Sequence, residues 1–313
     1  TMTKKAYHVR NWNKYNKALV QRGRVTFWLD EESISGWYSN ENEGRGRPKK
    51  YSNIAIIAIL TLKQVYGLTL REIQGFVESL FHLMGVHLET PSYTQVCRRQ
   101  SSVKLLKLPR STKSIHMVLD SSGLKIFGEG EWKVRQHGWS KHRMWRKLHI
   151  GVDESTQLIV AAVLSKNDCG DDEMLPDLLK QYQGAIHQVS ADGAYNSHAC
   201  YDEIARYGAV PTVPTQNHPK HKPKTEAQVK RPRDKVVFAI QQQGRKEWKA
   251  NSGYHRRSLA ETTFYRYKQL LGGNLYSRKL ENQCIEALVR CHALNKITLA
   301  GIPSSIDKNK SQF

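Results

Sequence analysis

Four residues in the last quarter of the chain combine a phenol, a guanidinium, a carboxylate and an ammonium at helical spacing. Tyr254, Arg257, Glu261 and Lys268 are separated by three, four and seven residues. At about 100° per residue on an α-helix, they fall within an arc of about 60°. A carboxylate beside two cations suits a site where a metal ion and a phosphate meet. A solvated charged face with an i, i+4 ion pair is the alternative.

The helix that carries these residues also needs a buried face. An apolar stripe lies next to the polar one and consists of Ala260, Phe264, Tyr267 and Leu271. Such a stripe can pack the helix against a core while the polar side faces a ligand. The sequence therefore predicts one continuous helix over residues 251–271. The nearby Trp248 is expected in the core rather than stacked on a DNA base.

Two aspartates follow apolar, strand-like segments elsewhere in the chain. Asp120 stands in V-L-D-S-S-G and Asp192 in V-S-A-D-G-A. An acid at the end of each of two core strands places both carboxylates at the same edge of a sheet. Glu261 is the candidate for a third. Each aspartate alone is also compatible with a plain turn cap.

Three neighbouring carboxylates require counter-charge. They repel by about 4 kcal/mol per pair at an effective dielectric constant near 20. Oxygen ligands on a basic protein select Mg²⁺ or Mn²⁺, and two ions about 3.5–4 Å apart can activate a hydroxyl and stabilise the departing oxygen of a phosphodiester. We therefore expect two Mg²⁺ (or Mn²⁺) ions per site, held by Asp120, Asp192 and Glu261.

The charge balance indicates a polyanionic partner. The 313 residues include 49 Lys and Arg against 28 Asp and Glu, a net charge of +21. Such an excess most often serves nucleic-acid binding. The longest apolar run, residues 54–60, is far shorter than the roughly 20 residues that span a bilayer. With no apolar segment of a signal peptide near residue 1, we expect a cytoplasmic protein that does not bind membranes.

The periodicity divides the chain into two domains. Residues 1–110 are predicted to form a helical DNA-binding domain, and residues 111–301 a catalytic domain that contains a basic connection, residues 216–250, of unassigned structure. Residues 302–313 are expected to be a C-terminal tail. In the second domain, three strands, a helix, a strand, a helix, a strand and a helix follow one another. This is the order of a ribonuclease-H-like α/β fold, a mixed sheet flanked by helices.

Three helices are predicted in the second half of the N-terminal domain. The first begins at a cap at residues 52–53 and ends at Gly67, the second begins with a capping box formed by Thr69 and Glu72, and the third begins at Ser92. Two apolar helices followed by a short polar one resemble a helix-turn-helix, although many structural three-helix units look the same. The expected DNA contacts are Tyr93, Thr94, Gln95, Arg98 and Arg99.

A basic linker, residues 44–50, precedes these helices. Its sequence is G-R-G-R-P-K-K. Arg45 and Arg47 resemble the minor-groove-reading core of an AT-hook. Lys49 and Lys50 extend the charge toward the DNA backbone. A flexible charged linker is the alternative, and either form can contact phosphates.

Several blocks of the sequence resemble the DDE transposases of the bacterial insertion-sequence family five. V-L-D-S-S-G-L-K-I-F-G-E-G-E-W-K-V-R-Q-H-G is similar to the first-aspartate block of that family, and S-A-D-G-A-Y to the second. The third block of the family has Tyr, two residues, Arg, three residues, Glu, six residues and Lys, which Y-H-R-R-S-L-A-E-T-T-F-Y-R-Y-K matches at each position. The similarity extends over nearly the whole chain.

This resemblance implies a DNA transposase that binds terminal inverted repeats, hydrolyses phosphodiester bonds at the element ends and joins the 3′-hydroxyl ends to target DNA. Asp120, Asp192 and Glu261 would hold the metal ions. Tyr254, Arg257 and Lys268 would hold DNA near the cleaved end. Two protomers would pair two ends, in the bacterial nucleoid. Three alternatives remain: a nuclease of the same fold without strand transfer, an inert DNA-binding protein derived from a transposase, and a basic structural protein of ribonucleoprotein complexes.

Overall fold

The computed structural model describes residues 7–39, 48–103, 107–127, 145–215, 223 and 225–307. The chain forms two compact units. The first contains residues 1–104 together with 293–313, and the second contains residues 105–292. The sequence prediction placed the boundaries at 110/111 and 301/302. The second unit instead ends inside a long helix, α13 (Leu280–Ala300).

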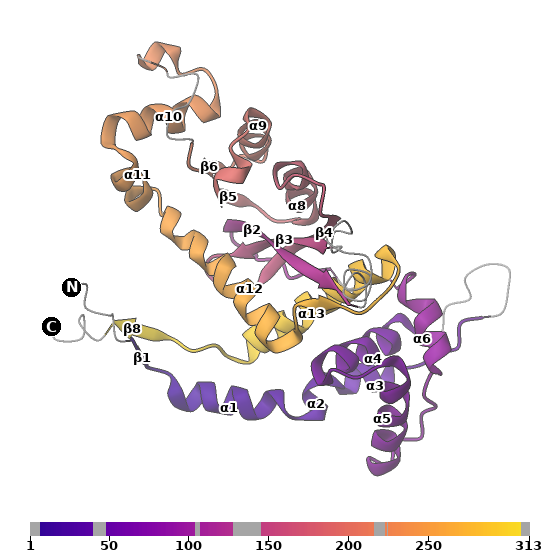
Figure 1. The fold of residues 1–313 in the computed structure, drawn as a ribbon. Helices are drawn as coiled ribbons and strands as arrows, with labels where there is room; N and C mark the ends of the chain where they lie inside the picture. The colour runs from indigo at the N-terminus through magenta and orange to yellow at the C-terminus, as the bar shows by residue number, and fades with distance from the viewer. Residues whose placement is uncertain are drawn as a thin grey trace, which may run out of the picture. The chain divides into compact units, whose positions relative to one another are not determined.

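A mixed sheet forms the centre of the second unit (Figure 1). Its strand order is β4-β3-β2-β5-β6, and β7 pairs with the far end of β2. β2, β3 and β4 are antiparallel neighbours, whereas β5, β6 and β7 run parallel to β2 or to each other. The predicted mixed sheet is therefore confirmed. The strands are β2 (Ile115–Ile126), β3 (Trp145–Asp153), β4 (Ile159–Lys166), β5 (Ile186–Ser190), β6 (Val210–Thr212) and β7 (Asn274–Leu275).

Helices flank this sheet on both faces. In Figure 1, α8 (Leu175–Gln181) and α9 (His198–Arg206) lie above the sheet, and α12 (Ser258–Leu271) lies below it. Successive side chains of a strand point to opposite faces. Met117 and Leu119 of β2 accordingly join the apolar core formed with α8 and α9. The residues that alternate with them, beginning with Asp120, face the side of α12.

The basic connection of residues 216–250 is largely helical where the structure describes it. α10 (Pro232–Gln243) begins with a proline in its first turn and Asp234 two positions later, and α11 (Arg245–Asn251) follows after Gly244. Proline and acidic residues favour the first turn of a helix. Trp248 of α11 is 5% exposed and belongs to the core, as expected.

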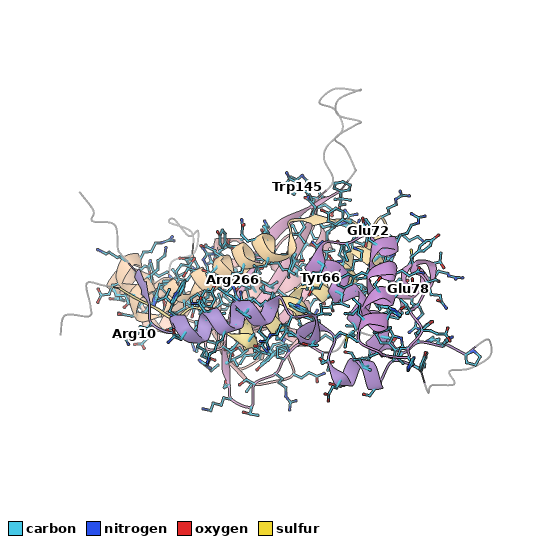
Figure 2. All side chains as sticks on the ribbon, turned by 90° about the horizontal axis from the view of Figure 1, so that it is seen from below. Arg10, Tyr66, Glu72, Glu78, Trp145 and Arg266 are labelled. Carbon is cyan, nitrogen blue, oxygen red and sulfur yellow. The ribbon has the colours of Figure 1, made fainter. Side chains whose placement is uncertain are left out.

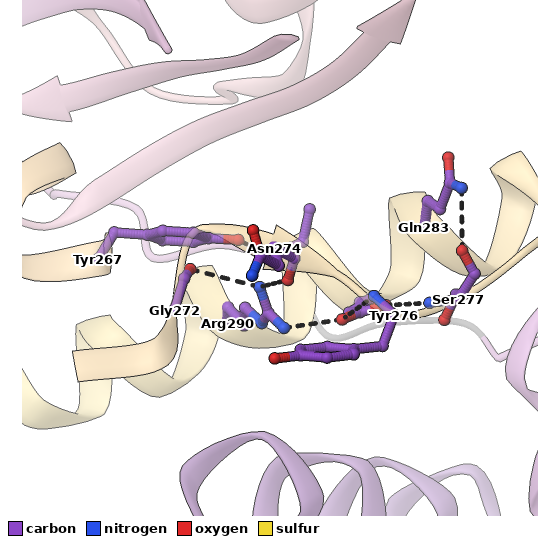
Figure 3. A network of polar contacts seen from close by, with 9 residues as sticks. Tyr267, Gly272, Asn274, Tyr276, Ser277, Gln283 and Arg290 are labelled. Atoms are coloured by element: carbon purple, nitrogen blue, oxygen red, sulfur yellow. Dashed lines mark hydrogen bonds and ion pairs between the residues drawn. The ribbon is translucent and has the colours of Figure 1, made fainter. Parts of the chain in front are cut away.

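A buried ion pair fixes the end of α12 to β7 and α13 (Figure 3). Arg290 donates to Glu286 at 2.7 Å and to the carbonyl of Asn274 at 2.8 Å. Glu286 in turn accepts from the backbone of Tyr276 and Ser277 at 3.1 and 2.9 Å. Because both charged groups are at most 1% exposed, every hydrogen bond they form matters for stability.

The first unit is helical, as predicted. Ser52 caps the N-terminus of α4, and Gly67, with a φ of 67°, ends it. Thr69 and Glu72 form the expected capping box of α5, and Ser92 caps α6. Figure 2 shows Glu72 and Glu78 along α5, near Tyr66 at the end of α4. The helices are α1 (Trp12–Arg22), α2 (Val25–Trp28), α3 (Glu31–Ser35), α4 (Asn53–Tyr66), α5 (Leu70–Leu83) and α6 (Tyr93–Gln100).

The two ends of the chain form a short antiparallel pair in this unit. β1 (Tyr7–Val9) pairs with β8 (Ser305–Asp307). The side chain of Asn11 donates to the carbonyl of Ile302 at 2.8 Å and accepts from the amide of Ser304 at 2.7 Å. The segment expected to be a tail therefore contains ordered structure, because its backbone groups find partners near residue 10.

Among the described residues, no single helix is both long and apolar enough to cross a membrane. In the ranges that the structure describes, one pair of helices, α4 and α5, reaches that length and apolarity when taken together, and the pair is bent by 107° at the break.

Candidate active site

Asp120 lies in the middle of β2 rather than at a strand end. The five residues before it are buried, and the next three are half-buried. The strand continues because β3 pairs with it as far as Lys125 and β7 pairs with its last two residues. The expected strand end at Asp120 was wrong. The residues change from buried to half-buried there because the surroundings of the strand change, while the strand itself continues.

Asp192 lies next to Asp120 in the direction across the strands, because β5 and β2 are neighbours in the sheet. β5 ends at Ser190, and its parallel register pairs Ser190 with Val118 of β2. Each aspartate follows its member of this pair by two residues, so both are at the same level of neighbouring strands. The Asp192 carboxylate accepts from the amide of Ala194 at 2.9 Å and begins a short 3₁₀ turn.

Arg257 brings Asp120 and Glu261 into one cluster. Its guanidinium forms an ion pair with the Glu261 carboxylate and lies 3.8 Å from Oδ1 of Asp120. The Glu261 side chain is half exposed, whereas the Asp120 side chain is mostly buried. Acids from β2 and α12 thus share one cation, which is the arrangement that two adjacent carboxylates need.

Burial raises the pKa of Asp120 from 3.8 to about 6. A hydrogen bond from the Ser121 backbone and the charge of Arg257 oppose this increase, while the charges of Asp192 and Glu261 add to it. A buried carboxylate that neighbours two further acids is poorly stabilised by the protein alone. A raised carboxylate pKa of this kind is common at functional sites.

The oxygen donors of Asp120, Asp192 and Glu261 suit a hard divalent cation. In the described part of the chain, however, no three carboxylate, histidine or cysteine side chains lie close enough to hold one ion together. The guanidinium of Arg257 contacts two of the three acids. The donor set therefore fits a metal ion by its chemistry, provided that Arg257 gives up these contacts.

The polar stripe does not lie on one continuous helix. Residues Tyr254–Arg257 form a 3₁₀ turn, and α12 begins at Ser258. Gly253 precedes the turn in the left-handed region, with a φ of 69°. The predicted helix over residues 251–271 was therefore wrong in its first part. Arg257 still reaches Glu261 because it directly precedes α12 at i, i+4 spacing.

Lys268, one of the predicted DNA ligands, is anchored to β2. Its Nζ donates to Oγ of Ser122 at 2.6 Å. Ser122 follows Asp120 by two residues and so points to the same face of the sheet. Ser122 was not among the predicted site residues, although the two serines after Asp120 were a usable signal.

Tyr254 packs beside other groups that suit nucleic acid. Its ring centroid lies 6.0 Å from that of Trp248 and 5.1 Å from Nζ of Lys249. Burial raises the pKa of the Tyr254 phenol, so the phenol keeps its proton and can donate a hydrogen bond. The charge of Arg257 opposes that increase.

A second arginine positions the 3₁₀ turn. Arg256 forms an ion pair with Glu154, which follows β3. The backbone amide of Glu154 donates to the carbonyl of His116 on β2 at 3.0 Å. The turn that carries Tyr254 and Arg257 is therefore tied to the sheet. Sequence reasoning missed Arg256 because its partner is about 100 residues away along the chain.

The predicted DNA contacts of the first unit differ in their surroundings. Arg45 and Arg47 lie outside the described residues. Lys49 is exposed, and Lys50 pairs with Glu89. On α6, Tyr93, Thr94 and Arg98 are exposed.

The other two predicted contacts on α6 are engaged inside the unit. Gln95 accepts from the backbone of Ser92 at 2.9 Å as part of the helix cap. Arg99 donates to the carbonyl of Tyr51 at 2.9 Å and to the side chain of Asn53 at 2.7 Å. Both side chains therefore use part of their hydrogen-bonding capacity inside the unit.

Comparison with known families identifies the chain. A family model described as a transposase DDE domain matches residues 111–296, and another with the same description matches residues 20–129. The first match alone covers more than half of the chain. The chain therefore belongs to the family of transposase DDE domains and is an enzyme of the DDE transposase type.

A search of solved structures matches the chain to the cryo-EM structure of a piggyBac transposase synaptic complex with hairpin DNA. The two chains are 10% identical, and the alignment covers 95% of this chain and 78% of that one with a TM-score of 0.37.

Proposed function

We propose that this protein is the transposase of a bacterial insertion sequence similar to family five, with a ribonuclease-H-like catalytic unit. It binds the terminal inverted repeats, hydrolyses the phosphodiester at each end and joins the freed 3′-hydroxyl to target DNA. The contact of Arg257 with both Asp120 and Glu261 carries this proposal. It joins candidate metal ligands and a candidate phosphate ligand in a single cluster.

The carboxylates of Asp120, Asp192 and Glu261 would hold two Mg²⁺ or Mn²⁺ ions. Such ions supply an activated hydroxyl nucleophile and stabilise the departing oxygen. With these acids committed to metal ions, Arg257 would be available to bind a phosphate beside them. Lys268, held by Ser122, provides a second cation, and the Tyr254 phenol donates a hydrogen bond to the DNA backbone.

Duplex DNA is the partner that the family and the charge of +21 support. Two protomers would each hold one transposon end, because an element must be released at both ends. The protein would act at the nucleoid, where its substrate lies. Helix α6 of the first unit would provide a helix-turn-helix-like contact with the repeats.

Replacing Glu261 by glutamine tests the catalytic assignment. Glu261→Gln should still bind duplex DNA carrying the inverted repeats that flank the coding sequence, but Mg²⁺-dependent cleavage of that DNA should fall by at least 100-fold. Glu281→Gln, an exposed acid at the start of α13, serves as the matched control and should cleave normally. Full strand transfer by Glu261→Gln would refute the assignment.

Joining activity separates a transposase from a nuclease of similar fold. A labelled end with a pre-formed 3′-hydroxyl should become covalently linked to a supercoiled plasmid when protein and Mg²⁺ are present. Cleavage without joining would indicate the nuclease. Binding with neither reaction would indicate an inert DNA-binding protein, and binding that is unchanged by randomising the repeat sequence would indicate a non-specific structural protein.

A further inference from the structure

A pocket of about 690 Å³ lies in the first unit, between the first turn of α5 and the exposed side of α6. Two of its seven lining residues are arginines, and none is acidic. The nearest acid in the sequence, Glu72, uses its carboxylate to accept from the amide of Thr69 at 2.7 Å in the capping box. The pocket therefore carries an excess of positive charge. Its lining residues are Thr69, Leu70, Arg71, Tyr93, Thr94, Cys97 and Arg98.

Within the part of the chain that the structure describes, neither arginine has a carboxylate partner. The guanidinium carbon of Arg71 lies 4.7 Å from the centroid of the Tyr93 ring, so the group stacks on an aromatic face. Arg98 donates only its Nε, to the carbonyl of Thr94 at 3.3 Å, among the contacts of the described residues. Their remaining N–H groups can bind an anion in the planar geometry that guanidinium provides.

The walls of the pocket are fixed to each other. The side chain of Gln74 on α5 accepts from the amide of Tyr93 at 2.8 Å, which ties the start of α6 to α5. The capping boxes at Thr69 and Ser92 hold the two helix starts that line it. A site whose walls are already ordered loses little entropy when it binds.

We propose that this pocket binds one phosphodiester of the DNA backbone, with Arg71 and Arg98 as its ligands. Stacking on Tyr93 holds the planar Arg71 guanidinium in place and leaves the N–H groups at its edge available to a ligand. Tyr93 and Leu70 supply apolar surface for the adjoining deoxyribose. This role rests on the proposed function, because it names the part of the bound duplex that the first unit holds. It also adds Arg71, on α5, to the contacts expected from α6.

The salt dependence of binding tests this role. Each phosphate contact that is lost should reduce the slope of log K against log salt by about 0.9. Between 50 and 200 mM salt, the wild type should therefore lose about 3.5-fold more affinity than Arg71→Gln or Arg98→Gln. Arg71→Lys should restore most of the slope because it keeps the charge. Arg24→Gln, an exposed arginine before α2, is the matched control and should keep the wild-type slope.

The choice of DNA distinguishes a phosphate contact from a base contact. Both glutamine variants should weaken binding to the inverted repeat and to a scrambled duplex by equal factors. Weakening confined to the repeat, with an unchanged slope, would overturn the phosphate role in favour of base reading. If the wild type cleaves repeat DNA while both variants keep its slope, this inference fails and the proposed function stands. If the wild type binds no DNA, the proposed function itself fails.

Cys97 offers a direct measurement in the same pocket. It is the exposed cysteine of the five, whereas Cys200 and Cys291 are buried. In a protein carrying Cys169→Ser and Cys284→Ser, duplex DNA should slow maleimide labelling of Cys97 at least tenfold, and this protection should disappear at 1 M salt. Labelling at an equal rate with and without bound duplex would place the DNA elsewhere and overturn the inference.

Discussion

Replacing Asp120 by asparagine should stabilise the metal-free protein at neutral pH. The Asp120 carboxyl is mostly buried, and its pKa rises from 3.8 to about 6, chiefly because burial disfavours the charge. Each pKa unit corresponds to about 1.4 kcal/mol. Keeping this group ionised therefore costs the folded state about 3 kcal/mol at pH values above 6, a cost that asparagine does not carry.

The pH dependence identifies the cause of this gain. Below about pH 3.8 the carboxyl is protonated in both the folded and the unfolded protein, so the cost disappears. As the pH rises from 3.8 to 6, the carboxyl releases its proton in the unfolded protein but keeps it in the folded protein. The free energy of unfolding therefore falls over this interval. The advantage of Asp120→Asn should therefore grow by about 3 kcal/mol between acidic pH and pH 7.5.

Urea denaturation in EDTA at pH 4 and pH 7.5 measures this difference. At about 2–4 °C per kcal/mol for a unit of this size, the melting temperature at pH 7.5 should rise by about 6–12 °C. Asp202→Asn, which removes an exposed carboxylate on α9, corrects for the general effect of charge on a strongly basic protein. An advantage of Asp120→Asn that is equal at both pH values, or that Asp202→Asn reproduces, would refute the reasoning.

Two further substitutions test how the site is supported. Arg290→Met should lower the free energy of unfolding by about 3–5 kcal/mol, because it leaves the Glu286 carboxylate buried without its cation; a loss below about 1 kcal/mol in urea denaturation would contradict this. Gly253→Ala should lower the free energy of unfolding by about 1–2 kcal/mol, because a φ of 69° disfavours a residue with a Cβ. The cost comes from the backbone alone, since the added Cβ meets nothing within 4 Å. Gly208→Ala, at a φ of 73° after α9, should lose similar stability, but only Gly253→Ala should weaken binding of repeat DNA, measured by fluorescence anisotropy.

Features that depend on neighbouring residues along the chain could be predicted from the sequence. The caps of α4, α5 and α6 are local, because a serine or threonine side chain bonds to an amide three residues later. The glycine that ends α4 is equally local. The succession of strands and helices along the chain followed from its apolar segments. These boundaries need no knowledge of what the helices contact.

Features that depend on distant residues could not be predicted. Asp120 lies mid-strand because β3 pairs with β2 as far as Lys125, and β7, about 150 residues later, pairs with the last two residues of β2. The 3₁₀ turn before α12 could not be predicted because spacings of three and four residues suit a 3₁₀-helix as well as an α-helix. Arg99 was predicted to contact DNA, but its guanidinium donates to Tyr51 and Asn53 near the start of α4. In each case a tertiary contact decides the outcome.

The pairing of β1 with β8 affects the order in which the protein is built on the ribosome. Residues 7–9 leave the ribosome before any residue of the central sheet, and their partners, residues 305–307, leave after all of it. All residues of the central sheet are synthesised in between, so the catalytic unit can fold before the final strand of the first unit has been synthesised. A nascent chain that stops before residue 293 would carry the candidate metal ligands but an incomplete first unit. Completion of the chain thus couples the candidate catalytic residues to the unit proposed to recognise the element.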